Sequence, residues 1–324
     1  MVRIRTASLA ALALIAALVP ASAQQYPSRP ITLVVPLPPG GTNDIMARIV
    51  GERMTKTLGQ QIVVENRAAG GSGTVATRQV ARSTPDGYTI LLSYTTTFAT
   101  GPSMYKNAGY DVRKDFAPIG LIAVSPSLVI ANKDFPVNDI PALLAHIRKI
   151  NEPFQYGAPG IGSVNHLAAE MFARVAKIRL VPIPYKGSNP LVTDLIGGHI
   201  KMAFNPIPVS RGALEGGLIR ALAVTSAKRS SQLPDVATLA EQGLPGFDVS
   251  LRYGLSAPAG TPPAIVAQLN KALNEALADE AVIRRIRHEG AEPNPTTPQE
   301  YAADIDAEET RWSAVVKELG IVGN

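Results

Sequence analysis

The sequence predicts an α/β fold with two domains, and three observations support this prediction. Apolar strands alternate with amphipathic helices along the chain, which is typical of doubly wound layers with mostly parallel sheets. The 324 residues are enough for two domains of ordinary size. Two extended stretches read as crossings between domains. We therefore expect residues 24–124 and 249–324 to form one discontinuous domain and residues 125–248 to form the other.

The N-terminal 23 residues have the pattern of a secretory signal peptide. Arg3 and Arg5 form a positive region, residues 7–19 are apolar, and Ala21-Ser22-Ala23 has the small-x-small spacing of a cleavage site. The alternative is an uncleaved anchor, but the apolar run is shorter than the roughly 20 residues that a membrane span needs. We predict export and cleavage after Ala23.

Composition excludes several classes of function. The net charge of +5 is small for this length, and Lys and Arg form no block with interleaved aromatic residues, so nucleic acid is not an expected partner. The chain contains no cysteine, which rules out disulfides and thiolate chemistry. The four histidines lack the spacing of a metal site, so we expect neither a metal nor a cofactor: His146, His166, His199 and His288.

The apolar patterns predict nine strands and seven helices. The strands are expected at 31–35, 62–65, 88–92, 119–124, 127–132, 180–183, 200–204, 220–225 and 249–257. The helices are expected at 43–58, 74–83, 139–150, 163–176, 190–197, 262–288 and 298–319. Thr261-Pro262 and Asn189-Pro190 pair a cap residue with proline at the first helical position. Thr297-Pro298-Gln299-Glu300 has the spacing of a capping box.

Two places predict that the chain passes between domains. Strands 119–124 and 127–132 are separated only by Ser125-Pro126, so one strand ends and another starts without a helix between them. Residues 247–257 form a long extended run. A double crossing leaves two hinge strands, and clefts between α/β domains are favoured sites for ligands.

The first glycine-rich turn, between strand 31–35 and helix 43–58, has the features of an anion site. Gly40 and Gly41 let the backbone approach a ligand, and the first N–H groups of a helix have no intrahelical partner. Plain N-capping by Thr42 or Asn43 explains the same residues without a ligand. Asp44 would repel a bound carboxylate. We expect it to cap the helix, order the loop, or hold a water, a ligand hydroxyl or an ammonium group.

A second glycine-rich turn precedes helix 163–176 and repeats the same physics. Ser163 can cap this helix, and two helix N-termini that face one cleft would each add partial positive charge. Ser163, His166 and Asp44 could be misread as a hydrolase triad, but nothing resembles a nucleophile elbow. We therefore expect no enzymatic activity.

Polar residues also follow other strand ends, where α/β clefts gather ligands. Ser93 and Tyr94 follow strand 88–92, and Tyr185 and Lys186 follow strand 180–183. Lys186 is a candidate for contact with an anion, and a solvated loop lysine is the alternative.

An ordered set of short motifs runs through the mature chain. The motifs are Pro27-Ser28-Arg29-Pro30-Ile31, Gly40-Gly41-Thr42-Asn43-Asp44, Val64-Glu65-Asn66-Arg67, Pro85-Asp86-Gly87-Tyr88-Thr89, Pro184-Tyr185-Lys186-Gly187, Leu233-Pro234-Asp235-Val236 and Ala257-Pro258-Ala259-Gly260-Thr261-Pro262. With them the chain resembles the periplasmic solute-binding receptors of tripartite tricarboxylate transporters, also called the Bug family. The resemblance covers essentially the whole mature chain.

The resemblance implies a Venus-flytrap fold in the periplasm, with a small organic carboxylate held between the domains and passed to a membrane permease. It implies carboxylate contacts by two facing loops, which here are Gly40, Gly41, Thr42, Asn43 and Asp44, and Gly162, Ser163, Val164, Asn165 and His166. We expect a monomer. A ligand-sensing partner of a membrane signalling protein is the alternative function, followed by a secreted hydrolase.

The chain departs from the family pattern at two positions. Asn205, at the end of strand 200–204, stands where the family often has Asp, and Arg252 stands where it commonly has an aromatic residue. Arg252 could hold a distal carboxylate in bidentate fashion, which predicts a ligand with a second anionic group. Alternate strand residues face opposite ways, so the alternative is that Arg252 points to solvent.

Overall fold

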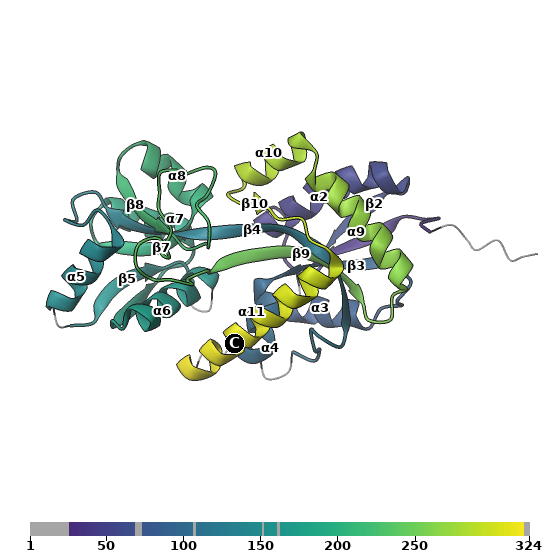
Figure 1. Ribbon diagram of the computed structural model, residues 1–324, viewed down its shortest axis with the longest axis horizontal. Coiled ribbons are helices and arrows are strands. Elements are labelled where there is room, and N and C mark those ends of the chain that lie inside the picture. Colours follow the sequence, from purple (N-terminus) through teal and green to yellow (C-terminus); the bar gives the residue numbers. More distant parts are fainter. Residues whose placement is uncertain (1–25, 69–72, 106–107, 151, 161–162, 321–324) are drawn as a thin grey trace, which may run out of the picture.

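The computed structural model describes residues 26–68, 73–105, 108–150, 152–160 and 163–320. The predicted signal peptide and the predicted site residue Gly162 lie outside the described residues. Two α/β lobes are joined by two long strands, as Figure 1 shows. The predicted α/β fold with two domains and two crossing strands is therefore confirmed. The boundaries of the two domains, as independently folding units, stay a prediction.

The first lobe starts with a parallel three-stranded unit. Its elements are β1 (Ile31–Val35), α2 (Thr42–Leu58), β2 (Ile62–Asn66), α3 (Thr74–Ala81), β3 (Thr89–Tyr94), the π-helical turn η2 (Thr96–Thr100) and α4 (Gly101–Met104). β1 lies between β2 and β3, and both pairs are parallel. Parallel pairing brings the carboxyl ends of these strands to one edge, and α2 starts from that edge.

The second lobe repeats the alternation of strands and helices. Its elements are α5 (Ile140–Ile150), β5 (Phe154–Ala158), α6 (Val164–Ala176), β6 (Leu180–Pro184), α7 (Ser188–Ile196), β7 (Met202–Pro206), α8 (Ile207–Glu215) and β8 (Ile219–Val224). β5 pairs in parallel with β6 and β7. The sequence patterns missed β5 and α8, and α8 begins directly after β7 without a separating turn.

The crossing strands are β4 (Phe116–Asn132) and β9 (Ser250–Pro258), which run antiparallel to each other. β4 is one continuous strand of 17 residues, so the predicted break at Ser125-Pro126 is wrong. The N-terminal part of β4 pairs with β9 in the first lobe, and its C-terminal part pairs with β7 and β8 in the second. Pro126 lies at this change of partners, where the missing N–H of proline is tolerated.

The expectation of mostly parallel sheets is also wrong. The strands form one path in the order β2-β1-β3-β9-β4-β7-β5-β6, and every pair that contains β4 or β9 is antiparallel. Within the lobes, β1 pairs in parallel with β2 and β3, and β5 pairs in parallel with β6 and β7. β4 and β9 cross between the lobes and run antiparallel to the strands beside them.

The predicted helix 262–288 is two helices, α9 (Pro263–Leu277) and α10 (Glu280–His288). Asp279 separates them, because its carboxylate accepts hydrogen bonds from the Ala281 and Val282 N–H groups and caps α10. The short strand β10 (Glu292–Pro293) follows and pairs with β4. The turn between α10 and β10 therefore lies next to the crossing strands.

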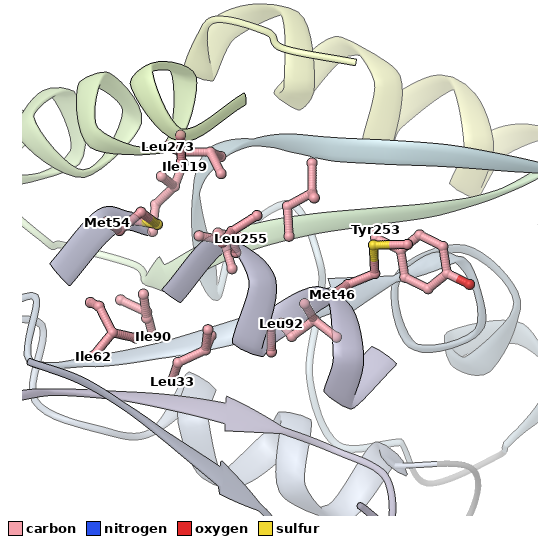
Figure 2. Packing of buried hydrophobic residues seen from close by; sticks show 14 of the residues in the cluster. Leu33, Met46, Met54, Ile62, Ile90, Leu92, Ile119, Tyr253, Leu255 and Leu273 are labelled. Carbon is pink, nitrogen blue, oxygen red and sulfur yellow. The ribbon is translucent and has the colours of Figure 1, made fainter. Parts of the chain in front are cut away.

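The main core of the first lobe lies between α2, α9 and the sheet. Met46 and Met54 of α2 pack with strand residues such as Leu33 and Leu255, as Figure 2 shows. At helical spacing these apolar residues share one face of α2, and its far end is closed by Gly59 in the left-handed region at φ 67°. This packing fixes the start of α2 above the crossing strands.

The final helix, α11 (Pro298–Leu319), contacts both lobes. It begins with the predicted capping box between Thr297 and Glu300. Its residue Tyr301 belongs to a first-lobe cluster, whereas Trp312 and Val315 belong to the cluster that contains the core of the second lobe. Among the helices of the described ranges, none is long and apolar enough to cross a membrane.

Candidate functional site

The start of α2 and the start of α6 meet at one cleft between the lobes. The cleft has a volume of about 110 Å³. Its lining comes from the two helix starts, the middle of both crossing strands, the start of α8 and the turn after α10: Thr42, Ser125, Pro126, Ser127, Val164, Asn165, Pro206, Pro208, Leu251, Tyr253 and Glu289. The N-termini of helices from both lobes therefore border the same space, as the two loops predict.

The N-terminus of α2 is not capped by a side chain. Its N-cap residue is Gly41, and no side-chain hydrogen bond satisfies the first N–H groups of the helix. Capping by Thr42 or Asn43, which was the alternative to a ligand site, is therefore not present. Gly40 has φ 86°, a conformation that favours glycine, which explains its place in the turn. Uncapped N–H groups at a helix start attract an anion.

Asp44 orders the first loop. Its carboxylate accepts a hydrogen bond from the Gly40 N–H at 3.0 Å and forms an ion pair with Arg48, with Nη2 2.9 Å from Oδ1. Burial alone would raise the pKa of Asp44, but the hydrogen bonds from Arg48, Gly40 and Asn66 outweigh it and lower the pKa. The negative charge is thus compensated within the loop, and Asp44 is not among the residues that line the cleft.

The N-terminus of α6 carries the predicted serine cap. The Ser163 hydroxyl accepts a hydrogen bond from the His166 backbone N–H at 3.3 Å. Asn165 lines the cleft, and its Oδ1 accepts a hydrogen bond from the Ser127 hydroxyl at 2.6 Å. That bond fixes the orientation of the Asn165 side-chain amide. Its NH₂ group, which carries two donor hydrogens, remains available to a ligand.

His166 lies outside the cleft. Its side chain is buried in the second lobe, with Nε2 3.6 Å from a Glu170 oxygen that also accepts a hydrogen bond from the Tyr156 hydroxyl. Burial lowers the pKa of His166, and the Glu170 charge opposes this shift only in part. The expectation that His166 contacts a ligand is not supported by this placement. With Asp44 in the other lobe and bound to Arg48, no triad forms with Ser163.

Alternate residues of the crossing strands face opposite sides. Ser125 and Ser127 of β4, with Leu251 and Tyr253 of β9, line the cleft. None of these four was predicted as a site residue. The alternation of the strand was the available signal, because once Arg252 is assigned to one face, its two neighbours must belong to the other.

Arg252 faces neither the cleft nor solvent. Its side chain is 12% exposed and forms ion pairs with Asp248 at 3.2 Å, Asp304 at 2.9 Å and Glu308 at 3.3 Å. The last two acids lie on α11. Burial opposes the charge of Arg252, but the three acids outweigh it and raise the pKa of the guanidinium. Arg252 therefore joins β9 to α11, and the prediction that it holds a second ligand carboxylate in the cleft is withdrawn.

Nine other predicted residues also lie outside the lining of the cleft within the described chain, and four of them belong to the two helix starts: Gly40, Gly41, Asn43 and Ser163. The Ser93 hydroxyl bonds to Tyr301 and Ser256, and the Tyr185 hydroxyl donates to Asp194 at 2.7 Å. The remaining three are Tyr94, which is buried in the first-lobe core, Lys186, which is exposed, and Asn205, whose Nδ2 donates to Ser210. Asn205 adjoins the lining through its neighbour Pro206, and Tyr94 does so through its strand partner Tyr253.

Glu289 is the charged residue of the cleft lining. It is the C-cap of α10, and its backbone N–H donates to the carbonyls of Arg285 and Ile286. No Lys or Arg occurs among the described residues that line the cleft. No local sequence pattern indicated Glu289, because the helix that it ends was predicted to run through residue 288 with no cleft beside it.

A larger cavity of about 570 Å³ lies on the other face of the crossing strands. It is lined by residues such as Val124, Ser250 and Arg252, which alternate with the residues of the cleft. No helix N-terminus opens into it within the described residues. Arg252 pairs with Asp248 inside this lining, whereas Arg229 and Glu292 pair with Glu241 and Arg287, which lie outside it. We therefore assign the candidate anion site to the smaller cleft, where uncapped N–H groups and amide donors converge.

Known proteins are similar to this chain over most of its length. A family model described as tripartite tricarboxylate transporter family receptor matches residues 46–321. Protein BugT of Bordetella pertussis strain Tohama I is 37% identical over 302 residues, covering 93% of this chain and 92% of that protein. The solved structure of R. palustris Rpa4515 with adipate has a TM-score of 0.75 and 37% identity, covering 92% of this chain and 99% of that chain. MatC from Rhodopseudomonas palustris with bound malate has a TM-score of 0.71 and 34% identity, covering 90% and 100%.

Proposed function

Because this chain belongs to the tripartite tricarboxylate transporter receptor family, whose relatives include periplasmic binding proteins, we propose that it captures a small organic carboxylate in the cleft between its lobes. The observation that supports this most is the meeting of two helix N-termini, one from each lobe, at a single cleft. Closure of the lobes about β4 and β9 would bring both sets of donors onto one anion.

The energetics are adequate for a receptor of ordinary affinity. A hydrogen bond to a charged group contributes about 1.5–3 kcal/mol. Micromolar binding requires about 8 kcal/mol net. The start of α2, the Asn165 amide and the start of α6 supply several such donors, and the two helix dipoles add to them.

The relatives indicate the class of ligand and the membrane permease that would receive it. Rpa4515 was solved with adipate and MatC with malate, which are both small carboxylates. Delivery of the ligand to the membrane permease of a tripartite transporter is the role that the family name implies, and we extend it to this chain. We also propose that the ligand leaves unchanged, because Ser163 caps its helix and His166 is directed to Glu170, so neither is placed as a nucleophile or a base.

Thermal unfolding of the exported chain, from Gln24 onwards, in the presence of small carboxylic acids tests this proposal. A ligand at about 100 times its Kd stabilises the folded state by about 2.7 kcal/mol, which raises Tm by several degrees. Calorimetry on each hit gives the affinity, and chromatography of the released ligand shows whether it was converted.

Two matched variants connect binding to the cleft. Asn165 and Asn189 are both the second residue of a second-lobe helix, but only Asn165 lines the cleft, whereas Asn189 is exposed. We expect Asn165→Ala to weaken binding about tenfold through the lost amide donors, and Asn189→Ala to leave it unchanged. Absence of binding to every carboxylate, or conversion of the bound acid, would contradict the proposed function.

A further inference from the structure

We propose that the ligand of the cleft is an aminocarboxylate, whose carboxylate binds at the helix N-termini and whose ammonium group binds Glu289. This inference rests on the proposed function and specifies the ligand class for the same cleft. It reverses the expectation of a second anionic group, because the structure removes Arg252 from the cleft and places a carboxylate there.

The position of Glu289 is fixed from both lobes. The next residue, Gly290, has φ 74°, and a Cβ atom on it would lie 2.5 Å from Pro208 Cδ, so the turn packs directly against the start of α8. The Gly290 carbonyl accepts a hydrogen bond from the Ser125 hydroxyl at 3.0 Å. Glu289 therefore lies where the first lobe touches the second, at the rim that closes over a ligand.

The carboxylate of Glu289 has no ion pair or side-chain hydrogen bond with any part of the chain that the structure describes. The neighbouring arginines already have other partners, since Arg284 pairs with Glu280, Arg285 with Glu52 and Arg287 with Glu292. The described lining of the cleft offers no other charged group that could compensate Glu289. Glu289 also borders a cavity of about 470 Å³ together with Arg284, Arg285 and His288, but within the described chain it forms no ion pair with them. A half-buried carboxylate without a direct ionic partner favours a cationic group from outside the chain.

Glu289 acts electrostatically on Tyr253, which also lines the cleft. Burial raises the pKa of the Tyr253 phenol most, Tyr94 and Glu289 raise it further, and a hydrogen bond with the Thr42 side chain lowers it. Tyr253 thus connects the start of α2 with the surroundings of Glu289. The cleft volume of about 110 Å³ requires a compact ligand. Within such a ligand a second carboxylate would be repelled by Glu289, whereas an ammonium group would be attracted.

A four-carbon series tests this assignment by calorimetry on the exported chain. Butanoate, succinate, 2-aminobutanoate and 4-aminobutanoate share one chain length and differ in whether an ammonium group or a second carboxylate is added. We expect at least one aminobutanoate to bind tenfold or more tightly than butanoate and succinate, since a charge-assisted hydrogen bond is worth about one to two decades in Kd. Tighter binding of succinate or butanoate would overturn the inference and leave the proposed function intact.

Variants of Glu289 locate the ammonium group. Glu289→Gln should weaken aminobutanoate binding about 10-fold to 100-fold and strengthen succinate binding, whereas Glu289→Asp keeps the preference for the amino compound. Glu280→Gln is the matched control, because it removes the same charge at the far end of α10, about 13 Å away along the helix, from a side chain that is 88% exposed. An unchanged preference in Glu289→Gln overturns the assignment. Loss of binding to all acids in the wild-type chain would instead reject the proposed function itself.

Discussion

Replacement of Arg252 by alanine separates a structural role from a ligand-binding role. The Arg252 side chain is 12% exposed and forms ion pairs with Asp248, which precedes β9, and with Asp304 and Glu308 of α11. Its removal takes away the ion-pair partner that the structure gives Asp248 and Asp304 and leaves Glu308 paired with Arg311. The cleft on the other face of β9 keeps its lining. We therefore expect Arg252→Ala to lower the free energy of unfolding and to leave ligand affinity unchanged.

The magnitude follows from the exposure of the three acids. Removal of one partner from a buried ion pair costs about 3–5 kcal/mol. The side chains of Asp248 and Asp304 are 28% and 26% exposed, so water replaces part of what they lose, whereas Glu308 at 5% is almost fully buried. A loss of about 2–4 kcal/mol is the expected result.

The assay can use the chain's only tryptophan. Trp312 is fully buried and its Nε1 donates to Glu308 at 3.0 Å, so its fluorescence reports on the cluster itself. Chemical unfolding of the wild type, Arg252→Ala and Arg252→Met would be followed by this signal, with calorimetry for ligand affinity. A change in stability below about 0.5 kcal/mol, or a loss of affinity without a loss of stability, would refute the reasoning.

Three further predictions concern charge and packing. Asp44→Asn should lower stability at pH 7 by about 1–2 kcal/mol through the lost pair with Arg48; because the pKa of Asp44 is lowered in the folded state, this difference should shrink as the pH falls below the ordinary carboxyl pKa of about 3.9 and vanish below the lowered pKa in denaturant titrations. Glu308 has a raised pKa because of burial, so its contribution to stability is lost as the pH rises above about 4.5, and Glu308→Gln should show a smaller loss between pH 4.5 and 7. Trp312→Ala should cost about 3–5 kcal/mol in thermal unfolding, and a cost under 1 kcal/mol would show that its cluster is not a core.

Local patterns were sufficient where local physics decides the outcome. The starts of α2 and α6 could be predicted because glycine and a following apolar periodicity are signals within a few positions, and at α6 the cap residue Ser163 adds to them. The same holds for the capping box of Thr297 and Glu300, which the structure contains. These features placed both helix N-termini of the cleft correctly.

Long-range partners decided the rest. Alternation along β9 leaves two possible faces for Arg252, and only the position of α11, about 50 residues later, supplies the acids that select one. Glu289 has no local signature, since its role depends on a turn that touches α8 across the hinge. The direction of β4 and β9 relative to their neighbours likewise follows from the exchange between lobes, which no short pattern contains.

The contribution of α11 to the second lobe has a consequence for how the chain folds. Trp312 and Val315 share a cluster with residues such as Val129, which precede them by more than half of the mature chain. Joining such distant residues costs loop-closure entropy and slows folding. Because a chain emerges from its N-terminus first, the second lobe cannot complete its interior until α11 has been made. We expect this delay to leave the second lobe incompletely packed while the rest of the chain is still being made.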